Sequence, residues 1–275
     1  MHTTASDGRL SPATLVDRAY AAGLTTIAVT DHDTTQSIDE VSRVAGARGI
    51  RVIPGVEVTS VHEGRDVHLL AYFIDHRDVA VERFLAAQRE RRLDRVREVG
   101  TRLARLGVPV DVEALSVRAR SRPGTAIGRP WLARALVRAG HAESVGDAFD
   151  RWLAQGQPAY VPRHGPTPFE VLEVVHAAGG VVSFAHPGVT KRDALIAPLA
   201  EAGLDAVEVY HSDHRQEHRD RYRGLAAALG LATSGGSDFH GFGETRGALG
   251  LVCLPPDEFR ALEARVSGAP ARTGR

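Results

Sequence analysis

The sequence predicts an α/β fold, either a barrel or an open sheet, with metal-binding side chains at one edge. Three observations support this prediction. Apolar runs of four to seven residues alternate with helix-like segments, a pattern typical of repeated βα units. Most of these runs carry a histidine or a carboxylate at the exit. Because α/β barrels and sheets hold their functional groups at the carboxyl ends of the strands, we expect these side chains to meet.

Length and composition are those of an ordinary globular protein. The 275 residues can bury one large core, or one core and a smaller lobe, and 43% are hydrophobic. No apolar run approaches the roughly 20 residues that span a bilayer. The first ten residues lack a basic region followed by an apolar stretch, so we expect no secretory signal. Cys253 is the only cysteine, which excludes an intramolecular disulfide and a cysteine-based metal site. We expect a buried Cys253 and a cytoplasmic protein.

The formal net charge is zero, but the charges are unevenly distributed. Residues 79–165 contain 16 Arg and 9 Asp plus Glu, an excess of seven positive charges, and the rest of the chain has the matching negative excess. The arginine-rich middle either favours an anionic ligand or forms a solvated helix face with ion pairs.

The first clear strand lies near the amino terminus. Residues 1–8 read as a loop, and Ser11-Pro12 then begins a helix, because Ser caps a helix and Pro suits its first position. Residues 27–29 form a short buried strand, followed directly by Asp31-His32-Asp33. After a second helix at 37–49, two more strands are expected: RVIPGVE, which ends at Glu57, and DVHLLAYFI, which contains His68.

At about Val79 the βα pattern gives way to helices. Apolar residues recur every three or four positions from Val81 to Leu106, which predicts a long amphipathic helix that ends at Gly107. Further helices are expected at 131–139 and 144–153, with core aromatics Trp131 and Trp152, and no strand pattern precedes 159–161. We therefore interpret residues 79–165 as a helical insertion, a lid over the substrate, within one α/β domain formed by 1–78 and 166–275.

The alternation resumes after Thr167-Pro168. Helices are expected at 168–178, 192–202, 216–229 and 256–266. Strands are expected at 181–187, ending in His186, at 206–211, ending in His211, at 231–240, ending in Asp238 and His240, and at 248–254.

The polar side chains that this reading brings together suit divalent metals. They are His2, Asp7, His32, Glu57, His68, His186, Asp238 and His240. Imidazole and carboxylate ligands together suit Mn²⁺, Zn²⁺ or Fe²⁺, whereas Mg²⁺ alone prefers fewer histidines. Eight ligands are too many for one ion, so we expect two or three ions bridged by a carboxylate such as Glu57. Such sites suit phosphate-ester hydrolysis, because the ions activate a bridging water, hold the phosphate and stabilise the leaving oxygen.

The other candidate groups are interpreted as supporting or structural. We expect Asp31 and Asp33 to orient His32 or to cap the turn. No Ser/His/Asp arrangement competes, and GGSDFHG lacks the lysine of a nucleotide-binding loop. The remaining histidines are expected to be structural or exposed: His62, His76, His141, His164, His176, His214 and His218.

Several motifs together resemble the PHP (polymerase and histidinol phosphatase) family over nearly the whole chain. In chain order they are HTTASDG, TDHDT, PGVE, DVHLLAYF, FAHPG and GSDFHG. IGRPWLARALV, AFDRWL and QPAYVP resemble the insertion of the branch that acts on nucleoside 3′,5′-bisphosphates and short RNA 5′ ends. The resemblance implies a distorted (β/α)7 barrel with a trinuclear, usually Mn²⁺-dependent site, whose ligands fall on the eight residues given above.

The chain departs from the family pattern at two places. The family opens with a strand ending in Asp-Leu-His-x-His, and here Met1 stands just before the second histidine, which is His2. We therefore expect the first strand and one metal ligand to be missing, sheet edges to be exposed, and metals to bind poorly. Trp131 stands where the branch usually has a histidine after GRP, which leaves the role of this position open.

Two further residues are candidates for contact with the substrate. Arg129 is expected to form a charge-assisted fork to a phosphate, or else an ordinary surface ion pair. His211 is expected to protonate the leaving oxygen, or else to support a metal ligand.

The leading functional hypothesis is a metal-dependent phosphatase that removes the 3′-phosphate of nucleoside 3′,5′-bisphosphates and also acts as a 5′→3′ exonuclease on short RNA. The arginine-rich insertion would hold the second phosphate. Histidinol-phosphate phosphatase and a non-catalytic PHP scaffold are the alternatives. The expected partner is a small phosphorylated nucleotide or short RNA, with no membrane and no obligate protein partner.

Overall fold

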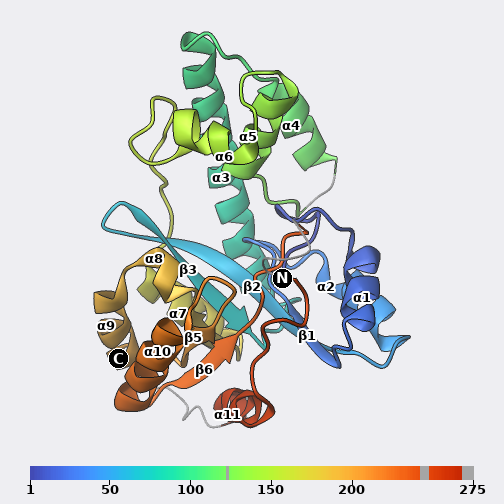
Figure 1. The fold of residues 1–275 in the computed structure, drawn as a ribbon, viewed down its shortest axis with the longest axis vertical. Coiled ribbons are helices and arrows are strands. Elements are labelled where there is room, and N and C mark those ends of the chain that lie inside the picture. The colour runs from blue at the N-terminus through green and yellow to red at the C-terminus, as the bar shows by residue number, and fades with distance from the viewer. Residues whose placement is uncertain (122–123, 242–247, 268–275) are drawn as a thin grey trace.

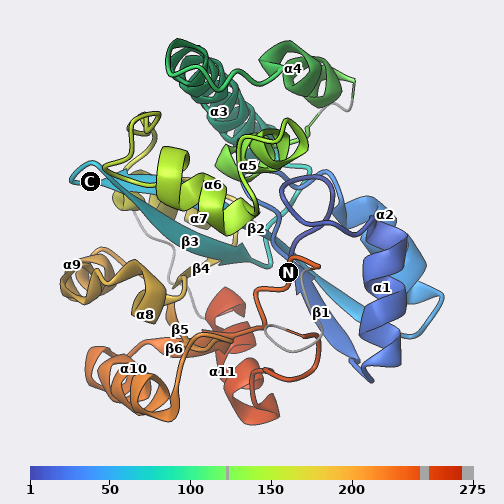
Figure 2. The ribbon, with the colours of Figure 1, turned by 45° about the horizontal axis from the view of Figure 1, so that its top comes forward.

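The computed structural model describes residues 1–121, 124–241 and 248–267 and has a mixed α/β fold. Its centre is a curled six-stranded sheet with the strands in chain order (Figures 1 and 2). The strands are β1 (Thr26–Val29), β2 (Arg51–His62), β3 (Arg65–Tyr72), β4 (Val181–Phe184), β5 (Ala206–Tyr210) and β6 (Ala232–Gly235). β1 is parallel to β2, and β4, β5 and β6 are parallel to one another. The α/β prediction is therefore confirmed.

The two longest strands form an antiparallel hairpin, which the βα pattern does not include. β2 pairs with β3 in antiparallel register, and β3 pairs with β4 in the same way. Glu63 and Gly64 connect β2 to β3, and both have positive φ, 49° and 72°. Such a turn matches the twist of a tight hairpin, and only antiparallel strands can be joined by two residues.

Helices cover the outer side of the sheet in Figures 1 and 2. They are α1 (Pro12–Ala21), α2 (Ile38–Gly46), α7 (Pro168–Ala177), α8 (Pro187–Thr190), α9 (Ile196–Glu201), α10 (Gln216–Leu229) and α11 (Pro256–Ser267). Ser11 Oγ accepts a hydrogen bond from Thr14 N at the start of α1, as expected of an N-cap. Thr167 and Glu170 form a capping box at the start of α7. The expected helix at 192–202 is divided into a short 3₁₀ turn, Asp193–Leu195, and α9.

The middle of the chain forms helices beyond one end of the sheet (Figure 1). They are α3 (Val79–Arg105), α4 (Val112–Arg120), α5 (Arg129–Arg138), α6 (Val145–Ala148) and a π-helical turn at Phe149–Leu153. Leu93, Val96, Trp131 and Leu136 belong to a buried apolar cluster formed by this part of the chain, against which Trp152 packs. Helix α4 was not predicted.

The predictions for two strand segments and one core residue are wrong. Residues 248–254 form no strand and contain a turn at 249–251, where Gly250 has a φ of 82° and Leu251 is 68% exposed. Cys253 is exposed there and not buried. Residues 159–161 lie outside the strands, and Ala159 and Val161 are apolar because they pack against the helices of the middle segment.

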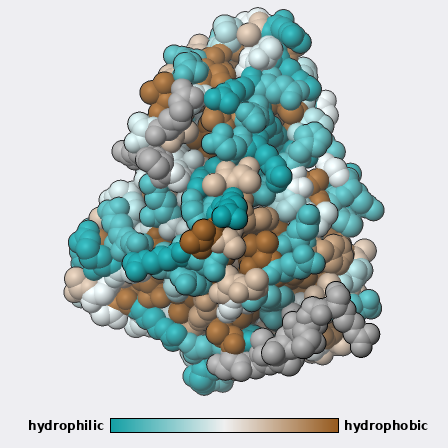
Figure 3. Space-filling model, turned by 180° about the vertical axis from the view of Figure 1, so that it is seen from behind, coloured by the Kyte–Doolittle hydropathy of each residue, from teal (hydrophilic) through white to brown (hydrophobic). Residues whose placement is uncertain are grey.

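Hydrophilic residues make up most of the rear face in Figure 3, with hydrophobic residues among them. Within the described residues, none of the helices combines the length and the apolar character that crossing a membrane requires.

Candidate metal centre

The parallel strands deliver four of the predicted side chains at their carboxyl ends. His32 follows β1, His186 follows β4, and Asp238 and His240 follow β6. His32 is fixed next to β2 by a parallel bridge to Glu57, in which Asp33 N donates to Glu57 O at 3.0 Å. These four positions follow the general rule for α/β sheets.

The hairpin delivers its side chains differently. Glu57 was expected at the end of a strand, but β2 continues for five residues to His62, so Glu57 lies in mid-strand. Glu57 on β2 is opposite Leu70 on β3, and His68 on β3 is opposite Thr59 on β2. The long hairpin therefore crosses the site, and it contributes Glu57 from the middle of β2 and His68 from β3.

A buried aspartate holds the amino-terminal loop over the site. Asp31 is 1% exposed and accepts hydrogen bonds from Thr3 N (2.7 Å), Thr3 Oγ (2.7 Å), Ser6 Oγ (2.6 Å) and Ser37 Oγ (2.5 Å). Gly8 completes the loop, since a Cβ there would lie 2.4 Å from the carbonyl oxygen of His2. Asp31 thus positions His2 and Asp7 through the backbone of the loop, whereas the sequence predicted that it would orient His32 or cap the turn.

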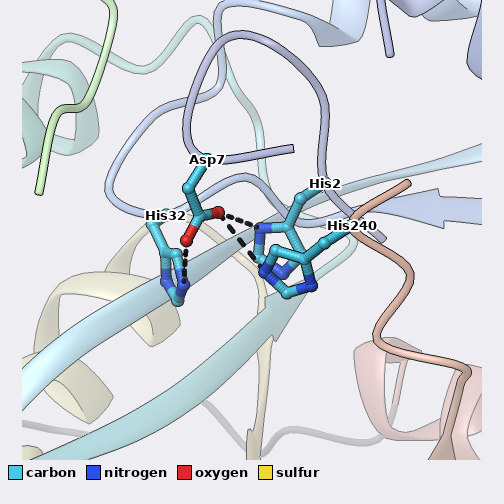
Figure 4. A group of neighbouring side chains, drawn as sticks. All are labelled: His2, Asp7, His32 and His240. Carbon is cyan, nitrogen blue, oxygen red and sulfur yellow. Dashed lines mark ion pairs between the residues drawn. The ribbon is translucent and has the colours of Figure 1, made fainter. Parts of the chain in front are cut away.

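The predicted ligands form three adjoining groups. They are His2, Asp7, His32 and His240; His32, Glu57 and His68; and His2, Glu57 and Asp238, each with one donor atom per residue and all donor atoms within 4.8 Å of one another. Figure 4 shows the first group, in which the Asp7 carboxylate lies between His32 and the stacked rings of His2 and His240. His2, His32 and Glu57 each belong to two groups, and the two oxygens of the Glu57 carboxylate suit a bridge between two ions.

Two of the three remaining predicted residues, His186 and His211, border this cluster. His186 Nε2 lies 3.3 Å from Glu57 Oε1. His211 Nε2 lies 3.6 Å from Asp238 Oδ2, and its Nδ1 accepts a hydrogen bond from Asp213 N at 3.1 Å. The structure therefore brings together nine of the ten residues that the sequence singled out, with Arg129 outside.

The carboxylates of the cluster remain ionised although they are buried. Burial acts to raise the pKa of Glu57, but His32 and His68 beside it hold that pKa well below its ordinary value. Burial lowers the pKa of His2, whereas hydrogen bonds to Asp238 and Glu57 raise it, and the resulting pKa is about 10. Burial lowers the pKa of His32 to about 3. A proton on His2 thus balances part of the negative charge of the carboxylates. Divalent ions would displace such protons, because metals bind neutral imidazole.

Two buried ring nitrogens indicate that the cluster suits metal ions. His32 Nδ1 and His68 Nδ1 have no hydrogen-bond partner among the described residues. A buried polar atom without a partner costs about 1–3 kcal/mol, so such atoms call for a specific explanation. A metal ion would use His32 Nδ1, and the mixed imidazole and carboxylate donor set fits a divalent first-row metal.

Arg129, which is half-buried, lies in a separate group of arginines. Its Nη2 is 3.3 Å from Asp66 Oδ2, and its Nη1 donates to the carbonyl of Leu153 at 3.3 Å. The arginine cluster consists of Arg92, Arg95, Arg129 and Arg163 around the carboxylates of Asp33 and Asp66.

The sequence reading missed three members of this arginine cluster, although a signal was present. Arg92 and Arg95 lie on the buried face of α3, between Gln88 and Val99 at spacings of three and four residues. Arginines at apolar helix positions are rarely buried unless they are paired. Their side chains are only 7% and 8% exposed. Arg163, from the segment that leads into α7, joins them with 10% exposure.

The other histidines take structural or exposed positions. The one buried example among the described residues, His214, donates from Nδ1 to the carbonyl of Val209 at 2.9 Å and accepts at Nε2 from Gly188 N at 3.1 Å. It joins the end of β5 to the first turn of α8, directly after His186. Trp131 is a core aromatic as expected, and its Nε1 also donates to the carbonyl of Ser6 at 2.9 Å.

The fold and the donor set together define the class of protein. Three groups of candidate metal ligands, which share residues, meet at the carboxyl edge of a curled α/β sheet. Such an arrangement is that of a metal-dependent hydrolase.

Comparison with known proteins identifies the family. The PHP domain family matches residues 1–107. The chain is 39% identical to the 5′-3′ exoribonuclease Rnm of Escherichia coli over 87% of this chain and 83% of that protein. It is 34% identical to the 3′,5′-nucleoside bisphosphate phosphatase of Chromobacterium violaceum over 96% and 95%. A crystal structure of a protein from Bifidobacterium adolescentis, described as a metal-dependent phosphoesterase, superposes with a TM-score of 0.87 and 34% identity over 98% and 95%.

The chain therefore belongs to the PHP family. It is a metal-dependent phosphoesterase, in agreement with the prediction from its motifs.

Proposed function

We propose that this protein removes the 3′-phosphate of nucleoside 3′,5′-bisphosphates and also degrades short RNA from its 5′ end. The observation that carries the proposal is the set of three ligand groups that share His2, His32 and Glu57. Three groups of donors suit two or three ions, and Mn²⁺ suits these donors better than Mg²⁺. The names of two relatives, an exoribonuclease and a bisphosphate phosphatase, support the choice of substrate.

The proposed ligands are the eight residues predicted from the sequence, and the protein adds a proton donor beside them. When bound, divalent ions activate water and polarise the phosphoryl group. His211 Nδ1 accepts a hydrogen bond from Asp213 N, so the neutral ring carries its proton on Nε2, beside Asp238. Burial lowers the pKa of His211, but Asp238 and Glu208 raise it above its ordinary value. His211 is thereby suited to protonate the leaving oxygen.

The arginine cluster would hold the second phosphate of the substrate. Four arginines surround two carboxylates, and Arg95 Nη2 and Arg163 Nε have no hydrogen-bond partner among the described residues. Arg92 Nη2 donates to Thr59 Oγ at 2.8 Å, and Thr59 is opposite His68 in the hairpin. The cluster therefore borders the metal centre, and residues 79–165 would act as a lid that contributes most of it.

The substrate assignment is tested by phosphate release. With Mn²⁺ present, adenosine 3′,5′-bisphosphate should be converted to the 5′-monophosphate, and a chelator should abolish the reaction. Histidinol phosphate is the alternative substrate, and it should be hydrolysed more slowly because it has one phosphate and leaves the arginine cluster unused. Faster turnover of histidinol phosphate would reject the proposal, and no hydrolysis of either substrate would favour a scaffold.

Replacing Arg129 by alanine should raise KM for the bisphosphate about tenfold. One charge-assisted fork to a phosphate is worth roughly 1.5–3 kcal/mol. The comparison is with adenosine 3′-monophosphate, whose KM should change little because it lacks the second phosphate. Arg151→Ala is the matched control, since Arg151 is a half-exposed arginine of the same segment that pairs with Asp147. Equal KM changes for both nucleotides would contradict the role of Arg129.

We further propose that one more strand between β1 and β6 closes the sheet into the expected (β/α)7 barrel. Among the described residues, β1 pairs only with β2, and β6 pairs only with β5. Met1 O accepts from Thr30 N at 3.0 Å and His2 N donates to Phe239 O at 2.8 Å, so Met1 and His2 already join the two edges. Next to them lies a cavity of about 360 Å³, lined in part by Ile27, Ala28 and Gly235.

Adding about ten residues before Met1, with Asp-Leu-His in register, should increase the bound metal and the thermal stability. The added strand would pair with both open edges and supply one more histidine ligand. A Gly/Ser extension of equal length is the control. If the chain with the Asp-Leu-His extension had the same metal content and activity as the chain without it, the proposal that an added strand closes the barrel would be refuted.

A further inference from the structure

A second hollow, outside the metal centre, lies between the amino-terminal loop and α5. It has a volume of about 310 Å³ and is lined by Thr4, Gly8, Arg9, Trp131, Arg134 and Arg138. Half of these residues are arginines and none is acidic. We call this hollow the α5 pocket. Its lining gives it a positive potential, which attracts anions.

The arginines of the α5 pocket are arranged by the helix. Trp131, Arg134 and Arg138 are spaced by three and four residues, so they share one face of α5. The Arg134 guanidinium lies over the Trp131 ring, 5.7 Å from its centre, and its Nη1 donates to the Asp7 carbonyl at 3.2 Å. An arginine that is fixed by stacking and hydrogen bonding loses less entropy when it binds a phosphate.

The α5 pocket adjoins the metal centre. The same residue, Asp7, accepts from Arg134 through its carbonyl and faces His2, His32 and His240 through its carboxylate (Figure 4). Gly8, the next residue, forms part of the pocket wall. The α5 pocket is therefore placed to receive a phosphodiester backbone that runs from the metal centre past the amino-terminal loop.

We propose that the α5 pocket binds the phosphodiester backbone of a short single-stranded oligonucleotide whose terminal nucleotide lies at the metal centre. This inference rests on the function proposed above. A nucleoside bisphosphate has two phosphates, for which the metal centre and the arginine cluster suffice. A third cationic site has a purpose only for a longer substrate. Because the arginines of the pocket contact phosphate and not the bases, the pocket favours longer oligonucleotides and does not distinguish their sequences.

The test is binding of a 5′-phosphorylated hexaribonucleotide with hydrolysis-resistant linkages and a fluorescent label, in the presence of Mn²⁺. The double variant Arg9→Ala/Arg138→Ala changes two exposed side chains of the pocket. Its Kd for the oligonucleotide should rise about tenfold or more, and the slope of log Kd against log salt should fall by about 0.7 for each phosphate that the variant no longer neutralises. Its affinity for adenosine 3′,5′-bisphosphate, measured by competition, should not change.

Two control variants separate this effect from a general loss of charge. Arg77→Ala/Arg260→Ala removes two arginines that are 73% and 67% exposed and lie outside the pocket, and it should bind the oligonucleotide like the wild type. Arg9→Lys/Arg138→Lys keeps the charge and should restore part of the affinity. A DNA hexanucleotide should show the same dependence on the two arginines, since the pocket binds phosphate and not the sugar.

Three results would overturn the proposal: no binding of the oligonucleotide by the wild type, an unchanged Kd in the double variant, or equal weakening for the bisphosphate. The last would assign the pocket to a phosphate of the mononucleotide. Because the binding measurement needs no turnover, it decides the role of the pocket even if the bisphosphate is not hydrolysed and the proposed function fails.

Discussion

Replacing Asp238 by alanine is expected to reduce kcat/KM for adenosine 3′,5′-bisphosphate by about a thousandfold or more. Asp238 Oδ1 lies 3.1 Å from His2 Nε2, and Oδ2 lies 3.6 Å from His211 Nε2. The substitution removes a proposed metal ligand and the partner of the proposed proton donor together. A bound metal contributes several kcal/mol to transition-state stabilisation, and each 1.36 kcal/mol is a factor of ten in rate. The measurement is phosphate release with Mn²⁺, together with the metal content of the protein.

The matched control for this variant is Asp257→Ala. Asp257 is 87% exposed and pairs locally, with Arg260 three residues away. It should retain wild-type activity and metal content. An Asp238→Ala protein that keeps its metals and more than a tenth of its activity would remove Asp238 from the ligand set and would weaken the assignment of His211 as well.

Replacing Asp33 by alanine is expected to lower the free energy of unfolding by about 3–5 kcal/mol. The Asp33 side chain is fully buried, pairs with Arg92 Nε through a hydrogen bond and lies 3.8 Å from Arg163 Nη1. It also accepts from Thr59 N at 2.9 Å. Without it, two buried guanidinium groups lose a counter-charge, which is the costly way to break a buried pair. Urea unfolding of the metal-free protein measures the change.

The pH dependence of this difference has a definite sign. Burial acts to raise the pKa of Asp33, but Arg92 and Arg163 hold it below its ordinary value. A carboxyl whose pKa is lower in the folded state stabilises the protein above its unfolded-state pKa, and this contribution is lost as the pH falls through the folded-state pKa. The gap between wild type and Asp33→Ala should therefore be full at neutral pH and shrink in acid.

An exposed aspartate provides the control for the stability measurement. Asp17 is 56% exposed and pairs with Arg48 at the surface, so Asp17→Ala should cost at most about 1 kcal/mol. A loss of stability in Asp33→Ala no larger than in Asp17→Ala would mean that the arginine cluster does not need its central carboxylate. A constant gap across acid pH would contradict the lowered pKa.

Much of the candidate site can be predicted from local motifs. His32, His186 and Asp238 lie two or three residues past the ends of β1, β4 and β6, and the direction of a parallel strand then decides where the side chain goes. The same logic fails for Glu57, because β2 continues past it into an antiparallel hairpin. The two-residue turn at Glu63-Gly64 was a readable signal of that hairpin.

Backbone strain at the site is not readable from the sequence. Asp33, His186 and Asp238 have φ values of 51°, 28° and 49°, which non-glycine residues rarely adopt. Each such residue costs about 1–3 kcal/mol and persists only where the surrounding structure fixes it. In this protein all three lie at or directly beside the predicted ligands, as strained residues at functional sites commonly do.

The sequence by itself determined the α/β class, the helices that begin at Ser11 and Thr167, and the candidate ligands of the metal centre. These depend on periodicity, capping and side-chain chemistry, which act within a few residues. Only the tertiary structure decided that β2 and β3 cross the site, that Arg92, Arg95 and Arg163 join Arg129 around two carboxylates, and that Arg9 meets α5 in a basic pocket. These interactions join residues far apart in the chain. Their contribution to the free energy of folding depends on burial, which no local pattern reveals.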